Sequence, residues 1–588
     1  MVGETGMKLE ELIAAARGEV EVDLLIEGAE VVNTLSGERR LSEVAISGGT
    51  VVGFDCESAK KTLDLSGMVL APGFIDGHVH LESAMVTIPE YARAVVPRGT
   101  TAVVADPHEI ANVLGAEGIR YILDSSRLSP LSVFVMLPSC VPATHIETSG
   151  ACLDAPALSE LIDEEGVIGI AEVMNYPGVL FRDPSVLAKI GLAGERRVDG
   201  HWPRIDGHCP LLSGRDLTAY VAAGIGSDHE CTSLEEAREK LRLGMRIMIR
   251  EGTAAKNLDD LLPLVNEVNS RRFLFVSDDR HPSEILREGH IDSMVRRAVG
   301  AGLDPVVAIQ IASLNAAEYF GLRDLGAIAP GRRADIVVLD GLDEFNVQKV
   351  LKDGALVAEG GRLLLPLRAA ARPRSSSMNV GAIAPGSFEI KAEGDLVRAI
   401  GVIPNQIITR SLLTRPKVEG DRVVADLDRD LLVMAVVERH RGTGNVGLGL
   451  VKGFGLVRGA IATSVAHDSH NIAAVGTSTE ELYWAVSAVE EMEGGLVVVD
   501  DGAVEASLPL PIAGLLSDRS MEEVAEKIKE VAGAAKDLGS SLEDPFMTLS
   551  FLCLPVIPEL KLTDKGLVDV TRFDFVSLFV GEGEEGKA

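Results

Sequence analysis

The sequence lacks several features that would place the protein in other classes. No Cys-x-x-Cys pair occurs among its six cysteines, which excludes a zinc ribbon or dithiol redox motif and favours reduced thiols in a cytoplasmic protein. No apolar run approaches the roughly 20 residues that span a bilayer, and no basic segment followed by an apolar one begins the chain. We therefore expect neither a membrane-spanning helix nor a signal peptide.

Positive charge is also scarce. Lys and Arg number 56 against 88 Asp and Glu, so the net charge is −32. This balance argues against nucleic acid or an anionic membrane surface as a partner. It fits a neutral or cationic small substrate, but solubility is the simpler explanation.

The distribution of short apolar runs predicts an α/β protein of several domains. Residues 1–72 and 325–368 contain short β segments, which we expect to form one composite β-sandwich domain built from both flanks. The insert between them, residues 73–324, is close to the roughly 250 residues of a (β/α)8 TIM-like barrel. Residues 369–378 look like a linker to a C-terminal α/β domain, residues 379–588.

Candidate barrel strands are apolar runs separated by helical patterns. Their predicted ends are His80, Asp106, Pro138, Glu172, His208, His229, Glu251 and Asp278. The fifth, residues 204–208, is the weakest because it is short and not very apolar. Active sites of such barrels lie at the carboxyl ends of the strands, so the His and acidic residues there should converge on one mouth.

The most informative motif is His78-Val79-His80, which follows an apolar run. Residues i and i+2 of a strand face the same way, so the two imidazoles lie side by side as a metal site requires. A single buried histidine is more often structural than a ligand. The ordered set of His and carboxylates at successive strand ends, which includes His108, nevertheless indicates a metal site.

The pattern resembles the amidohydrolase superfamily over about residues 20–365. The resemblance rests on residues 72–80, Pro-Gly-Phe-Ile-Asp-Gly-His-Val-His, and on residues 326–336. It implies a His pair on strand one, a bridging carboxylate on strand four, single His ligands on strands five and six and an Asp on strand eight. The implied metal ligands are His78, His80, Glu172, His208, His229 and Asp278.

The bridging position separates subfamilies. Hydantoinase-like members use a carboxylated lysine there, whereas residues 167–175 offer Glu172 and no lysine. A hydantoinase-like hydrolase of cyclic amides or amidines remains the enzymatic alternative, and a metal-binding scaffold without catalysis is a further one. Cytidine-deaminase-type chemistry is excluded, because His80-Leu81-Glu82 has no Pro-Cys-x-x-Cys to accompany it.

A finer resemblance is to the metal-dependent adenine deaminase family. It is carried by residues 106–110, Asp-Pro-His-Glu-Ile, by residues 206–210, Asp-Gly-His-Cys-Pro, by residues 277–282 and by residues 508–514 in the C-terminal region. It implies deamination of adenine to hypoxanthine and ammonia in purine salvage or adenine catabolism. It also implies one or two Mn²⁺ or Fe²⁺ ions, with Zn²⁺ as a further candidate. A homodimer is the expected assembly.

Roles can be assigned to individual residues from this chemistry, and the resemblance itself implies that of Asp278. Asp278 would move the proton from water to the leaving group, and Glu172 could take part as well as bridge. His108 would polarise the substrate or shuttle a proton, or else merely begin a helix. Asp279 and His281 are expected to orient Asp278 through hydrogen bonds, although Asp279 could simply cap the next helix. His467 and His470 suggest a second metal site, but a structural or pocket-lining role is favoured.

Overall fold

The computed structural model describes residues 7–56, 58–195, 204–253, 255–368, 371–404 and 406–581. The chain divides into two compact units. The first contains Met1–Pro107, Ile122–Ser139 and Asp154–Ala371, and the second contains His108–Tyr121, Cys140–Leu153 and Arg372–Ala588. Two segments of the range predicted as barrel therefore group with the C-terminal region. Of the predicted linker, residues 369 and 370 lie outside the described residues.

The first unit is built around parallel strands. These are β8 (Phe74–Val79), β9 (Thr100–Ala105), β10 (Ser132–Pro138), β11 (Val167–Val173), β12 (Arg204–Gly207), β13 (Ser227–Asp228), β14 (Arg246–Arg250) and β15 (Phe273–Val276). They pair in the orders β12-β11-β10-β9-β8 and β13-β14-β15. A parallel bridge between Val79 and Asp278 joins the first strand to the chain after the last. The predicted barrel is confirmed.

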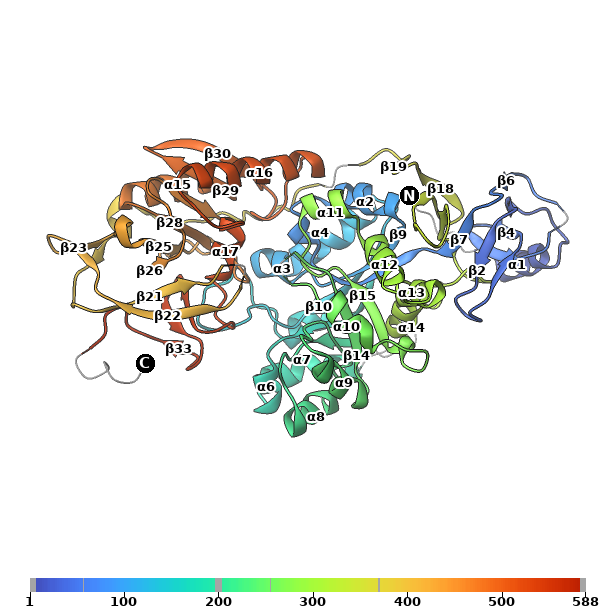
Figure 1. Cartoon of the computed structure of the whole chain (residues 1–588), viewed down its shortest axis with the longest axis horizontal. Coiled ribbons are helices and arrows are strands. Elements are labelled where there is room, and N and C mark those ends of the chain that lie inside the picture. Colours follow the sequence, from blue (N-terminus) through green and yellow to red (C-terminus); the bar gives the residue numbers. More distant parts are fainter. Residues whose placement is uncertain are drawn as a thin grey trace. The chain divides into compact units, whose positions relative to one another are not determined.

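Burial explains why these runs are strands. Every residue of β8 and of β9 is buried, as expected for parallel strands that are covered on both faces. The helices of this unit are α1 (Leu9–Ala16), α2 (Ile88–Val95), α5 (Ala155–Ser159), α6 (Tyr176–Leu180), α7 (Pro184–Glu195), α8 (Gly214–Ala222), α9 (Leu234–Arg242), α10 (Leu258–Leu261), α11 (Pro282–Glu288), α12 (Ile291–Gly300), α13 (Pro305–Ile311) and α14 (Leu314–Phe320). Helices α12, α13 and α14 pack against β15 (Figure 1).

Two smaller sheets complete the first unit. One has the order β5-β4-β1-β6, from β1 (Leu24–Glu27), β4 (Val44–Ser47), β5 (Thr50–Gly53) and β6 (Thr62–Asp64). The other has the order β19-β18-β17-β16-β7-β2-β3, from β2 (Glu30–Val32), β3 (Arg39–Leu41), β7 (Val69–Pro72), β16 (Ile336–Leu339), β17 (Val347–Lys352), β18 (Ala355–Glu359) and β19 (Arg362–Leu363). Because β7 pairs with β16, segments from both sides of the barrel share one sheet. Ile26, Val44, Leu70 and Ile336 join the two sheets in one core.

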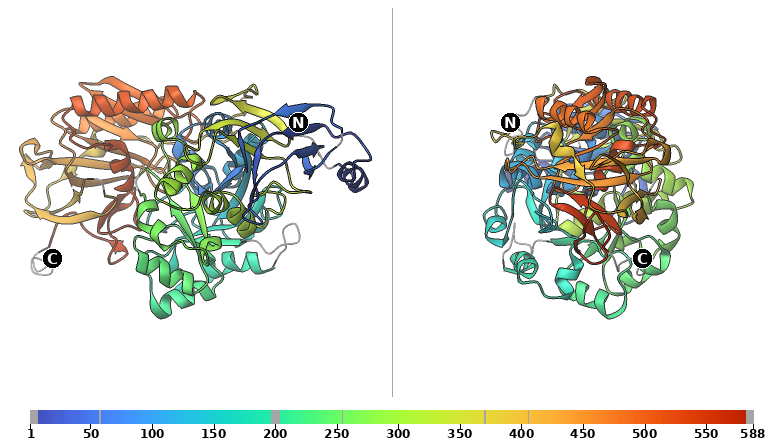
Figure 2. Two further views of the ribbon diagram at one scale, coloured as in Figure 1. Left: turned by 45° about the vertical axis from the view of Figure 1, so that its right-hand side comes forward. Right: turned by 90° about the vertical axis from the view of Figure 1, so that its left-hand side faces the viewer.

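The second unit contains a mixed sheet of order β22-β21-β26-β25-β28-β27-β29-β30. Its strands are β21 (Val397–Val402), β22 (Thr409–Thr414), β25 (Leu431–Val437), β26 (Val446–Lys452), β27 (Ala460–Thr463), β28 (Ile472–Gly476), β29 (Gly495–Asp500) and β30 (Ala503–Pro509). Helices α15 (Thr479–Glu491) and α16 (Met521–Asp537) pack on it (Figure 2).

Shorter elements accompany this sheet. They are α3 (His108–Leu114), α17 (Pro545–Phe551), β20 (Ile390–Lys391), β23 (Lys417–Glu419), β24 (Arg422–Val424), β31 (Leu560–Thr563), β32 (Gly566–Asp569) and β33 (Asp574–Phe575), and α4 (Ala116–Ser126) crosses from the second unit into the first. Among the described residues, no helix has the length and apolar character needed to cross a membrane.

Candidate metal centre

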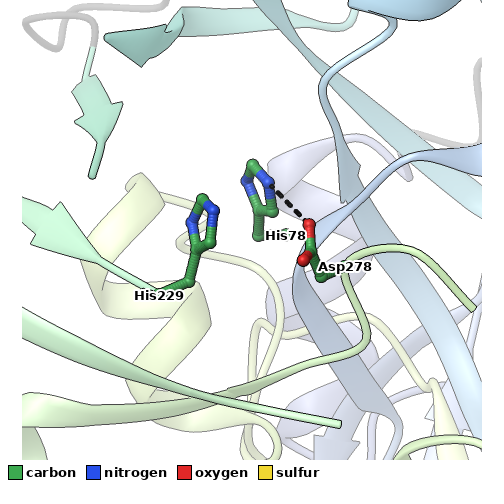
Figure 3. A group of neighbouring side chains, drawn as sticks. All are labelled: His78, His229 and Asp278. Atoms are coloured by element: carbon green, nitrogen blue, oxygen red, sulfur yellow. Dashed lines mark ion pairs between the residues drawn. The ribbon is translucent and has the colours of Figure 1, made fainter. Parts of the chain in front are cut away.

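The barrel gathers the six residues that the resemblance singles out as ligands. His78 lies in β8 and His80 follows it, so strand alternation turns both imidazoles to the same face. Glu172 lies in β11, while His208 and His229 follow β12 and β13 directly and Asp278 comes shortly after β15. His78, His229 and Asp278 point toward one another (Figure 3).

Glu172 stands between two groups of these side chains. Its Oε2 lies 3.1 Å from His229 Nε2, 3.7 Å from His208 Nε2 and 3.7 Å from His78 Nε2. Its Oε1 lies 3.9 Å from His80 Nε2. The atoms of His78, His80 and Glu172 are close enough to share one ion, and so are those of Glu172, His208 and His229. One carboxylate thus belongs to two potential ion sites.

Asp278 is held on two sides. Its Oδ1 lies 3.2 Å from His80 Nε2 and 3.7 Å from His78 Nε2, whereas its Oδ2 accepts a 2.7 Å hydrogen bond from Arg250. Arg250 also donates to Glu230, at 2.5 Å. Asp278 has a φ of 52°, a left-handed conformation that few residues other than glycine adopt. Such backbone strain occurs most often at functional sites.

The charges of these groups depend on one another. Burial alone would raise the pKa of Glu172, but His208 and His229 hold it well below its usual range. Burial would likewise raise the pKa of Asp278, which Arg250 and His80 instead hold well below. Burial would lower the pKa of His229, yet Glu172 raises it to about 10. The carboxylates are therefore anions, and protons occupy positions where a metal cation would be equally well placed.

The hydrogen bonds of the first two histidines fit a metal ion. Nδ1 of His78 lies 3.0 Å from an oxygen of Asp206, and Nδ1 of His80 lies 2.9 Å from the carbonyl oxygen of Asp106. Both partners accept, so each Nδ1 carries a proton, and Nε2 is the nitrogen of each ring that is left for a metal ion. The two Nε2 atoms are 3.2 Å apart, the separation of two nitrogens bound to one ion at about 2.1 Å.

The remaining predicted residues have other partners. Asp279 accepts a hydrogen bond from Ser83, and the amide of His281 donates to Thr253 at 2.9 Å, directly before α11. Their role in orienting Asp278 stays a prediction. His108 is buried at the start of α3, in the second unit, with its Nε2 3.6 Å from Glu109. Its catalytic role also stays a prediction.

The second unit has a buried cluster of its own. Glu109 pairs with His467 Nδ1 at 2.9 Å and with His470 Nε2, and His467 stacks on Phe551. Burial alone would raise the pKa of Glu109, but the two histidines hold it well below its usual range. The sequence motif had suggested the two histidines, but not Glu109 as their partner.

Three residues around these clusters escaped sequence reasoning. They are Asp206, Arg250 and Glu109. Asp206 had a usable signal. It precedes His208 by two residues at the end of β12, and residues two apart in an extended chain face the same side. Arg250 had a weaker one, a charged residue at the end of a strand whose three central residues are apolar. For Glu109 no sequence signal linked it to residues more than 350 positions away.

Comparison with known proteins agrees with the two-part organisation. The amidohydrolase family model matches residues 69–357, and the model of the adenine deaminase C-terminal domain matches residues 406–574. An adenine deaminase of Methanothrix thermoacetophila is 54% identical over 98% of this chain and 100% of its own length. Another, of Desulfatibacillum aliphaticivorans, is 52% identical over 97% and 99%.

A solved enamidase structure of the amidohydrolase superfamily has a TM-score of 0.42 and 17% identity, over 59% of this chain and 98% of that one. The full-length relatives carry the assignment by themselves, since about half of all residues are identical along nearly the whole chain. The chain belongs to the adenine deaminase family.

Proposed function

We propose that the protein hydrolyses adenine to hypoxanthine and ammonia, as a step of purine salvage. The carrying observation is the full-length identity of about half to relatives named adenine deaminase, together with the barrel cluster of four histidines and two carboxylates. Glu172 at the bridging position favours this reaction over hydantoinase-like hydrolysis, for which a lysine would be expected there.

The cluster would hold divalent metal. One or two ions would be held: one by His78, His80 and Asp278, and, where a second is present, that one by His208 and His229, with Glu172 shared between the two sets. Imidazole and carboxylate ligands suit Mn²⁺, Fe²⁺ or Zn²⁺, and the family resemblance favours the first two. When bound, such an ion lowers the pKa of a water molecule, so that hydroxide is available near neutral pH.

The side chains of the chain supply the proton transfers. Water adds to C6 of adenine while N1 gains a proton, and the amino group must be protonated before it leaves as ammonia. Asp278 is the proposed carrier, because Arg250 holds its Oδ2 and leaves Oδ1 directed at the centre. Glu172 is the second candidate. His108 is proposed to polarise the ring or shuttle a proton.

The test is direct. Protein loaded with Mn²⁺, Fe²⁺ or Zn²⁺ is mixed with adenine, and hypoxanthine is followed by ultraviolet absorbance with ammonia as a second signal. Conversion should fall strongly in Asp278→Asn and remain in Asp292→Asn, whose buried carboxylate pairs with Arg296 on α12. No conversion with any of the metals would reject adenine as substrate and return attention to other cyclic amidines and amides.

A homodimer and, from the scattered cysteines, a cytoplasmic location are further proposals. Light scattering on the purified chain tests the first, and cell fractionation tests the second.

A further inference from the structure

Asp206 connects the candidate metal centre to the barrel wall. The residue is fully buried in β12, between Arg204 and His208 in sequence. Its Oδ2 lies 3.0 Å from His78 Nδ1, and its Oδ1 accepts hydrogen bonds from the amide of Gly207 at 2.7 Å and from the hydroxyl of Ser227 at 2.6 Å. Two donors thus fix Oδ1 of the carboxylate, while Oδ2 faces the imidazole of His78.

This arrangement decides the tautomer of His78. A carboxylate oxygen accepts and cannot donate, so Nδ1 must carry the proton. The nitrogen left for a metal ion is then Nε2, which faces Glu172, Asp278 and the Nε2 of His80. A partner of this kind fixes the plane of the ring and makes Nε2 a better electron donor.

The two neighbouring histidines are supported unequally. His80 has the neutral carbonyl of Asp106 behind it, whereas His78 has a carboxylate. Hydrogen bonds to charged acceptors are about twice as strong as those between neutral groups. His78 is therefore the more firmly oriented of the pair.

The support for Asp206 continues outward. Ser227 Oγ lies 2.7 Å from the hydroxyl of Tyr319, and Ser227 already donates to Asp206, so the tyrosine donates to the serine. The guanidinium groups of Arg204 and Arg246 lie 5.6 Å and 5.0 Å from the centre of the Tyr319 ring. Four buried side chains, His78, Asp206, Ser227 and Tyr319, form one hydrogen-bonded series.

We propose that Asp206 is a positioning residue that sets His78 as an Nε2 ligand, with Ser227 and Tyr319 holding Asp206 in place. The inference rests on the proposed metal centre. It predicts a graded series, in which Asp206→Asn has the largest effect, Ser227→Ala a smaller one and Tyr319→Phe the smallest. Asparagine keeps the shape but can turn an N–H toward Nδ1, which would stabilise the wrong tautomer.

The experiment measures Mn²⁺ affinity of the metal-free full chain by competition with a chelator, with metal content by elemental analysis and the melting temperature alongside. Metal affinity should fall 10–100-fold in Asp206→Asn. Ser227→Ala should lose less, and Tyr319→Phe should remain close to wild type. Asp292→Asn is the matched control for a buried aspartate elsewhere in the same unit, and it should keep wild-type affinity.

A second readout separates orientation from general loosening. The visible absorption of Co²⁺ reports ligand number and geometry, so Asp206→Asn should change this spectrum whereas Asp292→Asn should not. If Asp206→Asn does not fold, Ser227→Ala carries the test, because it keeps the carboxylate and removes one of its donors.

The proposal is overturned if the folded Asp206→Asn variant keeps the metal affinity and the Co²⁺ spectrum of the wild type. If that variant fails to fold, the same result in Ser227→Ala overturns it. An equal loss of metal affinity in Asp292→Asn would also overturn it. Failure of the wild type to bind Mn²⁺, Fe²⁺ or Zn²⁺ would overturn it together with the metal centre. Metal binding without adenine conversion would reject the substrate alone and leave this inference standing.

Discussion

The two buried clusters of histidine and carboxylate, one in each unit, contain the same kinds of side chain but surround them differently. In the barrel, Nδ1 of His78 and Nδ1 of His80 face acceptors, so the inner Nε2 atoms are the nitrogens left for a cation. In the second unit, Nδ1 of His470 accepts a 3.2 Å hydrogen bond from the amide of Ala466. Burial lowers the pKa of His470, so its neutral ring carries the proton on Nε2, toward Glu109.

This difference shows that side-chain type alone does not make a metal site. The groups behind the imidazoles decide which ring nitrogen is engaged from outside and which is left to face the carboxylate. The barrel cluster is suited to a cation, and the cluster of Glu109, His467 and His470 is suited to hydrogen bonding. Metal binding at the second cluster, or no metal binding at the barrel cluster, would contradict this comparison.

The largest effect is expected from Glu172→Gln. The amide keeps the volume of the side chain but loses the charge and one of the two oxygens through which Glu172 faces the four histidines. We expect metal content to fall by at least half and kcat/KM to fall roughly 10³-fold. Elemental analysis and a steady-state assay measure the two. Full metal content in this variant would contradict the bridging role.

A change of pH is also expected to have a large effect on metal affinity. Without metal, His229 holds a proton with a pKa of about 10, because Glu172 outweighs the effect of burial. Metal must displace that proton, so the apparent affinity should rise with pH, about tenfold per unit for each proton released. Between pH 6.5 and 8.5 this amounts to about 100-fold for one proton.

The measurement is Mn²⁺ titration at several pH values in constant ionic strength. The same slope should appear in Glu109→Gln, because the cluster in the second unit is not part of the metal equilibrium. A flat affinity in the wild type would mean that His229 is already neutral in the metal-free protein.

Arg250→Lys should have a more modest effect. Arg250 Nη1 donates to Asp278 at 2.7 Å and to Glu230 at 2.5 Å, and Nη2 donates to the other oxygen of Glu230 at 3.1 Å, an arrangement that one ammonium group cannot reproduce. Metal content should stay close to wild type, while kcat should fall roughly tenfold because Asp278 loses its fixed orientation. Arg296→Lys, on α12, is the control. A loss of metal with unchanged kcat in the fully loaded protein would assign Arg250 to ion binding instead.

Much of the barrel could be predicted because its strands are buried on both faces. Continuous apolar runs such as Phe273–Val276 can be recognised as strands in the sequence. The fifth run, the weakest in the sequence, is the short strand β12. The grouping of residues 108–121 and 140–153 with the C-terminal region could not be predicted. It depends on contacts across hundreds of residues, such as the hydrogen bond from Asn471 to the carbonyl of Thr148.

The residues of the candidate site also fall into those that the sequence predicts and those that it does not. Residues at strand ends could be proposed from order alone, since parallel strands bring their carboxyl ends together. The partners behind them could not, because the pairing of His78 with Asp206 depends on the register of nonadjacent strands and that of Asp278 with Arg250 on side-chain reach. These partners are the groups that distinguish the two clusters chemically.

The smallest effect on metal binding is expected from Glu109→Gln, which tests the cluster of the second unit instead of the barrel cluster. Metal content and affinity should equal those of the wild type, because the cluster holds protons. Stability should nevertheless fall by about 1–3 kcal/mol, since two buried imidazoles lose a charged acceptor. Chemical denaturation of the metal-free chain measures this change.

The matched control is Glu147→Gln in the same unit. Burial and the nearby Asp468 raise the pKa of Glu147 to about 8, so this side chain is largely neutral at pH 7 and an amide replaces it at little cost. Glu109 is an anion at the same pH, and its stabilising contribution should be lost only in acid, as the pH falls through its lowered pKa. Equal destabilisation by both substitutions at pH 7, or loss of one metal equivalent in Glu109→Gln, would show that the second cluster holds a cation or no charge at all.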